Sequence, residues 1–171
     1  MMGGIRPGRM DRRSAMDTPL PLETEFLFRL TLAVDAPQGI GPSRGGALRI
    51  VPVAGGHFAG PRLRGEVVPG GGADWLRVEP DGTTHLDVRL TLREAGGGLI
   101  ACQYTGLRAG PPEVLERVGR GEAVDPGAYY FRAAMRFETA AADLAWLARL
   151  LAVGVGQRLP GGPVYDVYAV R

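Results

Sequence analysis

Several residue types that support common chemistries are scarce in this sequence or absent from it. The 171 residues include no Lys and no Asn, one Cys, two His and two Ser. Without Lys, neither a Schiff-base lysine nor a Walker-type phosphate loop can form. Ser14 and Ser43 lie in predicted tail and loop segments, so a Ser-His-Asp triad lacks a nucleophile. His57, His85 and Cys102 do not have the spacing of metal ligands, and we predict no metal site and no cofactor.

The single cysteine and the lack of long apolar runs bear on location. Cys102 cannot form an intramolecular disulfide, which fits a reducing compartment. We interpret it as a small buried residue of a strand. No apolar run reaches the roughly 18 to 20 residues of a membrane span, and no continuous apolar segment marks a secretory signal. The sequence therefore predicts a cytoplasmic protein without a membrane partner.

Charge is distributed unevenly between the N-terminal segment and the rest of the chain. All 20 basic residues are Arg, and the 18 acidic residues leave a net charge of +2. Residues 1–22 carry four Arg and two Asp, so they hold this net charge, and the remaining charges cancel. We therefore expect no nucleic-acid partner. Residues 1–22 also lack periodicity and predict a disordered N-terminal tail, with a lid over a cavity as the alternative; residues 23–171 form the predicted domain.

Glycine and proline are abundant, with 27 and 14 residues, which favours many short strands over a few helices. Polar and apolar residues alternate in residues 24–34, 85–92 and 129–139. Further strands are expected at 48–53, 63–68, 76–78, 99–107, from residue 146, and at 164–170. Turns are expected at 80–82 and 96–98, a loop at 37–46, and a short helix from Pro112 to Gly119 or Gly121. The predicted fold is a single antiparallel β-barrel with one short flanking helix, closed by pairing of the last strand with the first.

Residues 55–75 specify several of these features at once. Gly55-Gly56 is predicted to form a tight turn, and the glycines at 70–72 a reversal that presents the loop residues Asp74 and Trp75. With Glu66, these residues are expected near the mouth of the barrel.

The polar faces of the alternating strands permit two interpretations. If the apolar faces fill the lumen, the charged residues form surface ion pairs; if the polar faces point inward, they line a cavity. Tyr130 shares a face with Arg132, Arg136 and Glu138, and Asp74 adjoins Trp75, which favours the cavity. Trp75 and Trp146 are either core residues or an aromatic clamp. On the cavity interpretation the catalytic candidates are Glu66, Asp87 and Glu138, and the substrate-binding candidates are Asp74, Trp75, Arg89, Tyr104, Tyr130, Arg132, Arg136 and Trp146.

Arg and Tyr on one wall suit an oxygenated anion, and an interior carboxylate suits a general acid or base. The sequence thus predicts acid–base isomerisation, cyclisation or lyase chemistry on a small, partly apolar molecule. A non-catalytic carrier and a purely structural module are the alternatives. The outer faces of a barrel with a helix on one side also favour a homo-oligomer, without fixing the number of subunits.

Six motifs resemble those of domain-of-unknown-function family 3237, also called uncharacterised protein family 0311. They are Gly60-Pro61-x-Leu63-x-Gly65, Gly71-Gly72-Ala73-Asp74-Trp75, Asp87-x-Arg89, Tyr130-Phe131-Arg132, Arg136-Phe137-Glu138-Thr139 and Val153-Gly154-Val155-Gly156. The resemblance spans residues 24–170 and implies a single barrel, similar to lipocalin-like and allene-oxide-cyclase-like barrels, without implying an activity. Ala148 and Leu144 stand where the family commonly has Asn and Tyr.

Overall fold

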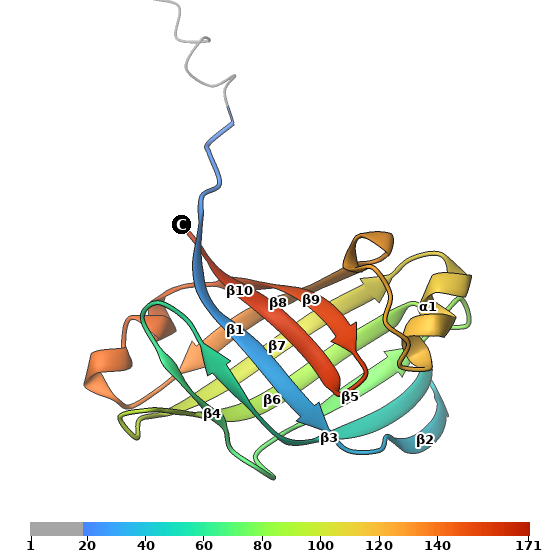
Figure 1. Cartoon of the computed structure of the whole chain (residues 1–171), viewed down its shortest axis with the longest axis horizontal. Coiled ribbons are helices and arrows are strands. Elements are labelled where there is room, and N and C mark those ends of the chain that lie inside the picture. Colours follow the sequence, from blue (N-terminus) through green and yellow to red (C-terminus); the bar gives the residue numbers. More distant parts are fainter. Residues whose placement is uncertain (1–18) are drawn as a thin grey trace, which may run out of the picture.

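The computed structural model describes residues 19–171, and these form a closed antiparallel barrel with eight strand positions (Figure 1). The predicted fold class is therefore confirmed. The strands are β1 (Thr24–Val34), β2 (Gln38–Ser43), β3 (Gly46–Ala59), β4 (Arg64–Val67), β5 (Ala73–Val78), β6 (Thr84–Glu94), β7 (Leu99–Ala109), β8 (Tyr130–Glu138), β9 (Ala152–Leu159) and β10 (Gly162–Val170). The helix α1 (Pro112–Gly119) lies between β7 and β8, as predicted.

Strand β1 closes the barrel by pairing with β10 on one side and with the second half of β3 on the other. The register Thr24↔Val170 brings the start of the first strand beside the end of the last, so the predicted closure is confirmed. The short strands β4 and β5 share the position between β3 and β6, and β2 pairs with the first half of β3. The tail predicted for residues 1–22 lies, apart from residues 19–22, outside the described residues.

Apolar side chains fill the interior, and polar ones face outward. On β6, Leu86, Val88, Leu90 and Leu92 are buried, and on β8 Phe131, Ala133, Met135 and Phe137 are buried. Burying these side chains contributes roughly 1.5 to 3 kcal/mol for each large one, which exceeds what exposed ion pairs could return. The expectation that the polar faces of these strands point into the lumen was therefore wrong.

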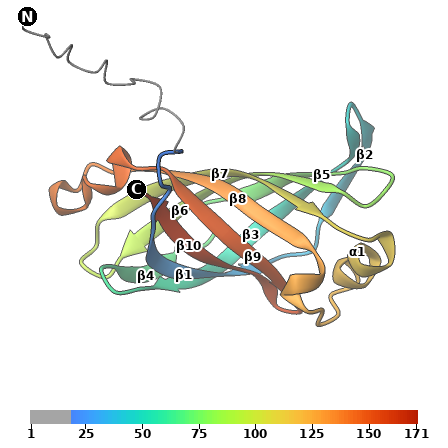
Figure 2. The same cartoon turned by 90° about the horizontal axis from the view of Figure 1, so that it is seen from above.

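The two ends of the barrel differ. Figures 1 and 2 show α1 and the β2 hairpin at one end, and the short turns between β8 and β9 at the other. Those turns, η2 (Ala142–Leu144) and η3 (Leu147–Arg149), bury Leu144 and Leu147. The strand expected from residue 146 begins only at Ala152, because the preceding Ala-rich segment forms these turns. Phe28 lies against both Phe58 and Phe137, with ring centroids 5.4 and 5.9 Å apart, and fills part of the lumen.

Two glycine-rich segments are strands where a turn or a loop was expected. Gly55 and Gly56 lie within the continuous strand β3, with φ of +153° and +145°. There the pairing of β3 with β1 shifts register between Ala33 and Val34, which is the pattern of a β-bulge. Residues 37–46 contain β2, joined to β3 by a turn at which Gly45 and Gly46 have positive φ.

Candidate functional site

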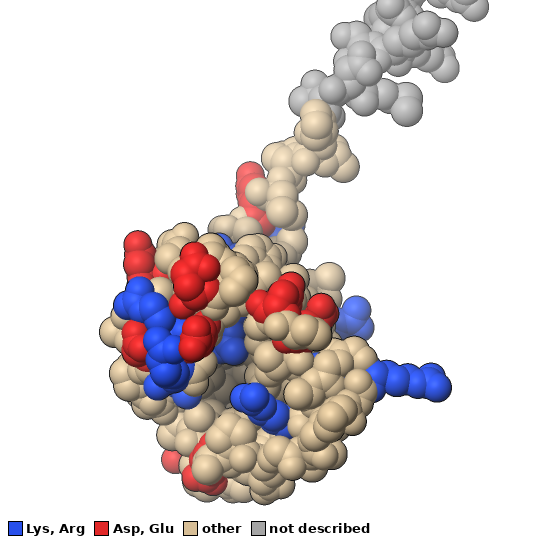
Figure 3. Space-filling view, turned by 90° about the vertical axis from the view of Figure 1, so that its right-hand side faces the viewer, with Lys and Arg blue, Asp and Glu red and all other residues tan. Residues whose placement is uncertain are grey.

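A cavity of about 600 Å³ occupies the half of the barrel next to α1. Its walls are mainly apolar, with contributions from Leu32, Val53, Leu76, Leu86 and Val88 and from Leu115 of α1. Figure 3 views this end and shows a hollow with both basic and acidic side chains around it. A pocket of this size and lining is typical of a small-molecule site. Its polar lining residues are Asp35, Arg49, Asp74, Glu79, Asp81, Thr84, Tyr104, Arg108, Glu116, Arg158 and Tyr165.

Asp74 reaches the cavity because it lies on strand β5 and not on the expected loop. Alternation along β5 turns Asp74 inward and leaves neighbouring Trp75 37% exposed on the outside. Its Oδ1 accepts a hydrogen bond from the Asp87 backbone N–H at 3.1 Å. Burial raises the pKa of Asp74 to about 7, although that hydrogen bond and the charge of Arg108 act in the opposite direction. Asp74 can therefore exchange a proton near neutral pH.

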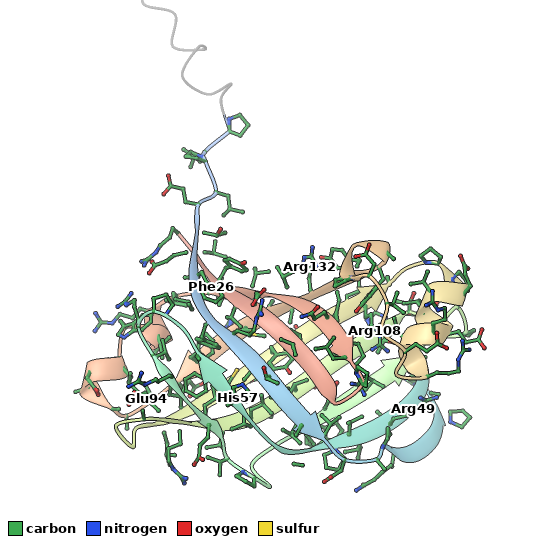
Figure 4. All side chains as sticks on the ribbon, viewed as in Figure 1. Phe26, Arg49, His57, Glu94, Arg108 and Arg132 are labelled. Carbon is green, nitrogen blue, oxygen red and sulfur yellow. The ribbon has the colours of Figure 1, made fainter. Side chains whose placement is uncertain are left out.

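Arg108 extends from β7 into the same cavity, in the half of the barrel near α1 (Figure 4). Its Nη2 donates to Thr84 Oγ1 at 3.2 Å, and its guanidinium lies 5.8 Å from the centre of the Phe131 ring. Burial lowers the pKa of Arg108, and the charge of Arg158 lowers it further. Arg108 Nε is buried and has no hydrogen-bond partner among the described residues.

Arg158 enters the cavity from β9, at the next inward position after Gly154 and Gly156. Its backbone N–H donates to the Tyr129 hydroxyl at 2.9 Å, and its Nη1 donates to the Leu159 carbonyl. Burial lowers the pKa of this guanidinium also. Arg108 and Arg158 thus place two positive charges in one mainly apolar cavity.

Two buried tyrosines also line the cavity. Tyr104 and Tyr165 pack edge to face with their ring centroids 5.4 Å apart, and Tyr165 packs in the same way on Phe131 at 5.3 Å. Burial raises the pKa of both hydroxyl groups, so both are protonated donors at neutral pH. The Tyr104 hydroxyl lies close enough to influence the pKa of Tyr165, but its direction is poor for a hydrogen bond, and no other described residue satisfies the Tyr165 hydroxyl.

Of the predicted site residues, the structure brings only Asp74 and Tyr104 into the cavity. The three carboxylates predicted to be catalytic lie on outward-facing positions. Glu66 pairs with Arg93 at 2.7 Å, Asp87 pairs with Arg89 at 3.2 Å, and Glu138 is exposed. Because the apolar faces fill the lumen, these groups remain in solvent, and their expected placement inside the barrel was wrong.

The remaining predicted binding residues also lie outside the cavity, where several arginines cover aromatic rings. Arg89 lies 6.0 Å from the Trp75 ring, Arg132 lies 5.2 Å from the Tyr130 ring, and Arg136 is exposed. Trp146 packs partly against the core beneath Arg62, whose guanidinium is 3.8 Å from the ring. No aromatic clamp of Trp75 and Trp146 is formed around this cavity by the described residues.

Sequence reasoning missed Thr84, Arg108, Arg158 and Tyr165, although a signal for the arginines was present. The inward positions of β7 run Ile100, Cys102, Tyr104, Gly106 and then Arg108. Every second residue of a strand faces the same side, so a charged residue in line with these apolar residues also points inward. Arg108 can therefore be recognised as a cavity residue once the apolar face is known to point inward.

The two positions at which this sequence departs from the family pattern, Leu144 and Ala148, do not contribute to the cavity. Leu144 is buried and Ala148 exposed at the other end of the barrel, and neither lines the cavity.

Residues 19–171 contain no cluster of three His, Cys, Asp or Glu placed to hold a metal ion. No helix in this part of the chain has the length and apolar character needed to cross a membrane. Burial raises the pKa of the Cys102 thiol to about 12, which leaves it protonated.

Comparison with known proteins gives consistent matches along nearly the whole described chain. The family model described as "Protein of unknown function (DUF3237)" matches residues 22–170. A UPF0311 protein of Rhodopseudomonas palustris is 34% identical over 149 residues, which cover 87% of this chain and 97% of that protein. A UPF0311 protein of Clostridium acetobutylicum is 35% identical over 147 residues, covering 85% and 92% of the two chains.

Solved structures show the same fold. The crystal structure of the Rhodopseudomonas palustris protein, described as a conserved protein of unknown function, has a TM-score of 0.86 and covers 90% of this chain and 100% of its own. An enzyme from Penicillium herquei, 21% identical, has a TM-score of 0.69 with coverage of 91% and 98%, a likeness that concerns the fold alone. On the family model and on relatives above 30% identity, this chain belongs to the DUF3237 family, also named UPF0311.

Proposed function

We propose that this protein is a cofactor-independent barrel enzyme that transfers a proton on a small, oxygenated, partly apolar molecule, in an isomerisation, cyclisation or lyase step. The observation that carries the proposal is the Asp74 carboxyl group, which lines the cavity with a pKa of about 7. A group with this pKa is present both as acid and as base at neutral pH, which suits general acid–base catalysis.

The groups near Asp74 supply the second requirement, stabilisation of the charge that develops on the substrate. When ionised Asp74 removes a proton from a C–H or O–H group, negative charge forms on a substrate oxygen. Arg108 and Tyr165 line the same cavity, and each has a buried donor without a hydrogen-bond partner of good geometry among the described residues. Donors fixed in an apolar site stabilise such an oxyanion more strongly than water does. Protonated Asp74 can then return the proton at another position, which completes an isomerisation or cyclisation.

A carrier of similar ligands is the second candidate function. The mainly apolar cavity and its polar lining residues support binding even if Asp74 transfers no proton. The two functions differ in whether the Asp74 carboxylate is required for turnover.

A general-base probe separates them, because it needs an apolar cavity and a carboxylate but not the natural substrate. With 5-nitrobenzisoxazole, Asp74 would take the ring C–H proton, the N–O bond would break, and a nitrile and a phenolate would form. We expect the wild type to accelerate phenolate release, and Asp74→Asn to lower that rate at least about tenfold. The wild-type rate should rise with pH around a midpoint near 7, because the ionised carboxylate is the base.

Glu66→Gln and Glu138→Gln are the matched controls, since each removes a carboxylate that faces solvent. Both should retain the wild-type rate. If Asp74→Asn were as active as the wild type, or if the two surface variants lost as much activity, catalysis by Asp74 would be disproved and the carrier function favoured.

A further inference from the structure

The cavity contains two buried donors that no described residue satisfies. Arg108 uses Nη2 for Thr84, while its Nε is buried without a partner. The Tyr165 hydroxyl is likewise buried and unsatisfied within residues 19–171. Buried polar groups in folded proteins nearly always have partners, and one left unsatisfied costs roughly 1 to 3 kcal/mol. Both residues line the cavity, and a small shift of their side chains toward it would allow a ligand to supply the acceptors.

The cavity is lined by Arg49, Arg108 and Arg158 and by the carboxylates of Asp35, Asp74, Glu79, Asp81 and Glu116, but Arg108 and Arg158 form no ion pair among the described residues. Surface arginines of this barrel find carboxylates, as in Arg29–Asp166 at 2.7 Å and Arg117–Glu122 at 2.8 Å. Across the described residues, no carboxylate lies at ion-pair distance from Arg108 or Arg158. Asp74 is the acid whose charge acts on Arg108, and it is only partly ionised at neutral pH. The buried Arg108 guanidinium, which has no ion-pair partner among the described residues, favours an anionic ligand.

The number and kind of donors restrict the chemical class of the anionic ligand further. A carboxylate has two oxygens that together accept about four hydrogen bonds, and it matches the planar guanidinium in shape. It can therefore satisfy Arg108 Nε and the Tyr165 hydroxyl with different oxygens, while Arg158 adds a second positive charge. A phenolate offers one oxygen, and a phosphate dianion would lose more hydration against these apolar walls. The Phe131 ring and the aliphatic side chains suit a flat apolar body.

We propose that the ligand of this cavity is a flat, apolar organic acid held through its carboxylate by Arg108, Tyr165 and Arg158. The inference rests on the proposed function, because it assigns the chemical class of the same cavity's ligand. Its test measures binding alone, so that the result is separate from any result on turnover.

The experiment is calorimetric titration of the full chain with 2-naphthoate and with its uncharged analogue 2-naphthamide. The wild type should bind naphthoate at least about tenfold more tightly than naphthamide. Arg108→Gln and Tyr165→Phe should each weaken naphthoate binding about tenfold or more, with little change for naphthamide. Tyr165→Phe is informative even if Arg108→Gln does not fold, because the Tyr165 hydroxyl forms no well-aligned hydrogen bond with the described residues and only the nearby Tyr104 hydroxyl is affected by its loss.

Arg149→Gln is the control, since Arg149 is exposed on η3 at the other end of the barrel. It should bind naphthoate like the wild type. The proposal is overturned if naphthoate does not bind or if the two compounds bind equally. It is also overturned if Arg149→Gln weakens naphthoate binding as much as Tyr165→Phe does. Loss of naphthoate binding alongside Asp74-dependent turnover of 5-nitrobenzisoxazole would reject the ligand class and leave the proposed function standing; the reverse pattern would reject catalysis alone.

Discussion

At pH 8, Asp74→Asn is expected to be more stable than the wild type, with a free energy of unfolding roughly 2 to 4 kcal/mol higher. The pKa of Asp74 is about 7 in the folded protein against an ordinary 3.8, so between these values the folded state binds more protons than the unfolded state. Wild-type stability therefore falls as pH rises from about 4 to 7. The difference between a pKa of about 7 and one of 3.8, at about 1.36 kcal/mol for each pH unit, sets the upper value. Asparagine does not ionise, and its side-chain oxygen can still accept from the Asp87 N–H.

Urea unfolding between pH 4 and pH 9 measures this difference. The two proteins should have similar stability at pH 4 and should diverge as pH rises, and the difference should level off above pH 7. Glu138→Gln, which alters an exposed carboxylate, should follow the wild-type curve. Parallel curves for Asp74→Asn and the wild type would show that Asp74 ionises without a penalty, and would also weaken the case for a base with a raised pKa.

Gly56→Ala is expected to destabilise the fold by about 4 kcal/mol or more, because the added methyl group meets backbone atoms that cannot move aside. A Cβ at Gly56 would lie 2.1 Å from the Thr31 carbonyl oxygen and 3.1 Å from the Leu32 Cα. The φ of +145° adds strain for any residue with a side chain. Thermal unfolding should show a fall of about 8 °C or more in Tm, given roughly 2 to 4 °C per kcal/mol at this chain length.

The neighbouring Gly55 provides a matched control. Its φ of +153° is similar, but a Cβ there would meet nothing closer than 3.8 Å. Gly55→Ala should therefore lose only part of the stability that Gly56→Ala loses. Gly39 faces open space, so Gly39→Ala should be about as stable as the wild type. Equal losses at Gly55 and Gly56 would assign the effect to backbone strain and contradict the steric explanation.

The barrel could be predicted because its strands carry their own signal. Alternation on β6 and β8 marks an inward and an outward face regardless of what the rest of the chain does. Turn residues at 80–82 and 96–98 separate successive strands, and the terminal strand has an obvious partner in β1. The prediction was wrong for the glycine-rich segments for a related reason. Backbone pairing in β2 and at Gly55-Gly56 needs no alternating side chains, so composition alone indicates a loop or turn.

The candidate site was predicted less well than the fold, because it depends on which face of each strand points inward. Tyr104 continues an apolar face and reached the cavity, whereas Glu138, on the polar face of β8, did not. Asp74 was selected as a loop residue and is in fact a strand residue that points inward. The convergence of Arg108, Arg158 and Tyr165 joins residues of β7, β9 and β10. Local sequence patterns contain no information on such long-range proximity.

The unequal filling of the barrel has a consequence for how such a protein can diversify. The aromatic contacts of Phe28, Phe58 and Phe137 lie apart from the residues that line the cavity. Residues that line a hollow lose fewer packing contacts when they change than residues of a filled interior do. Substitutions around the hollow can accordingly redirect ligand choice while the filled half keeps the strands in register, so that one scaffold can serve relatives with different ligands.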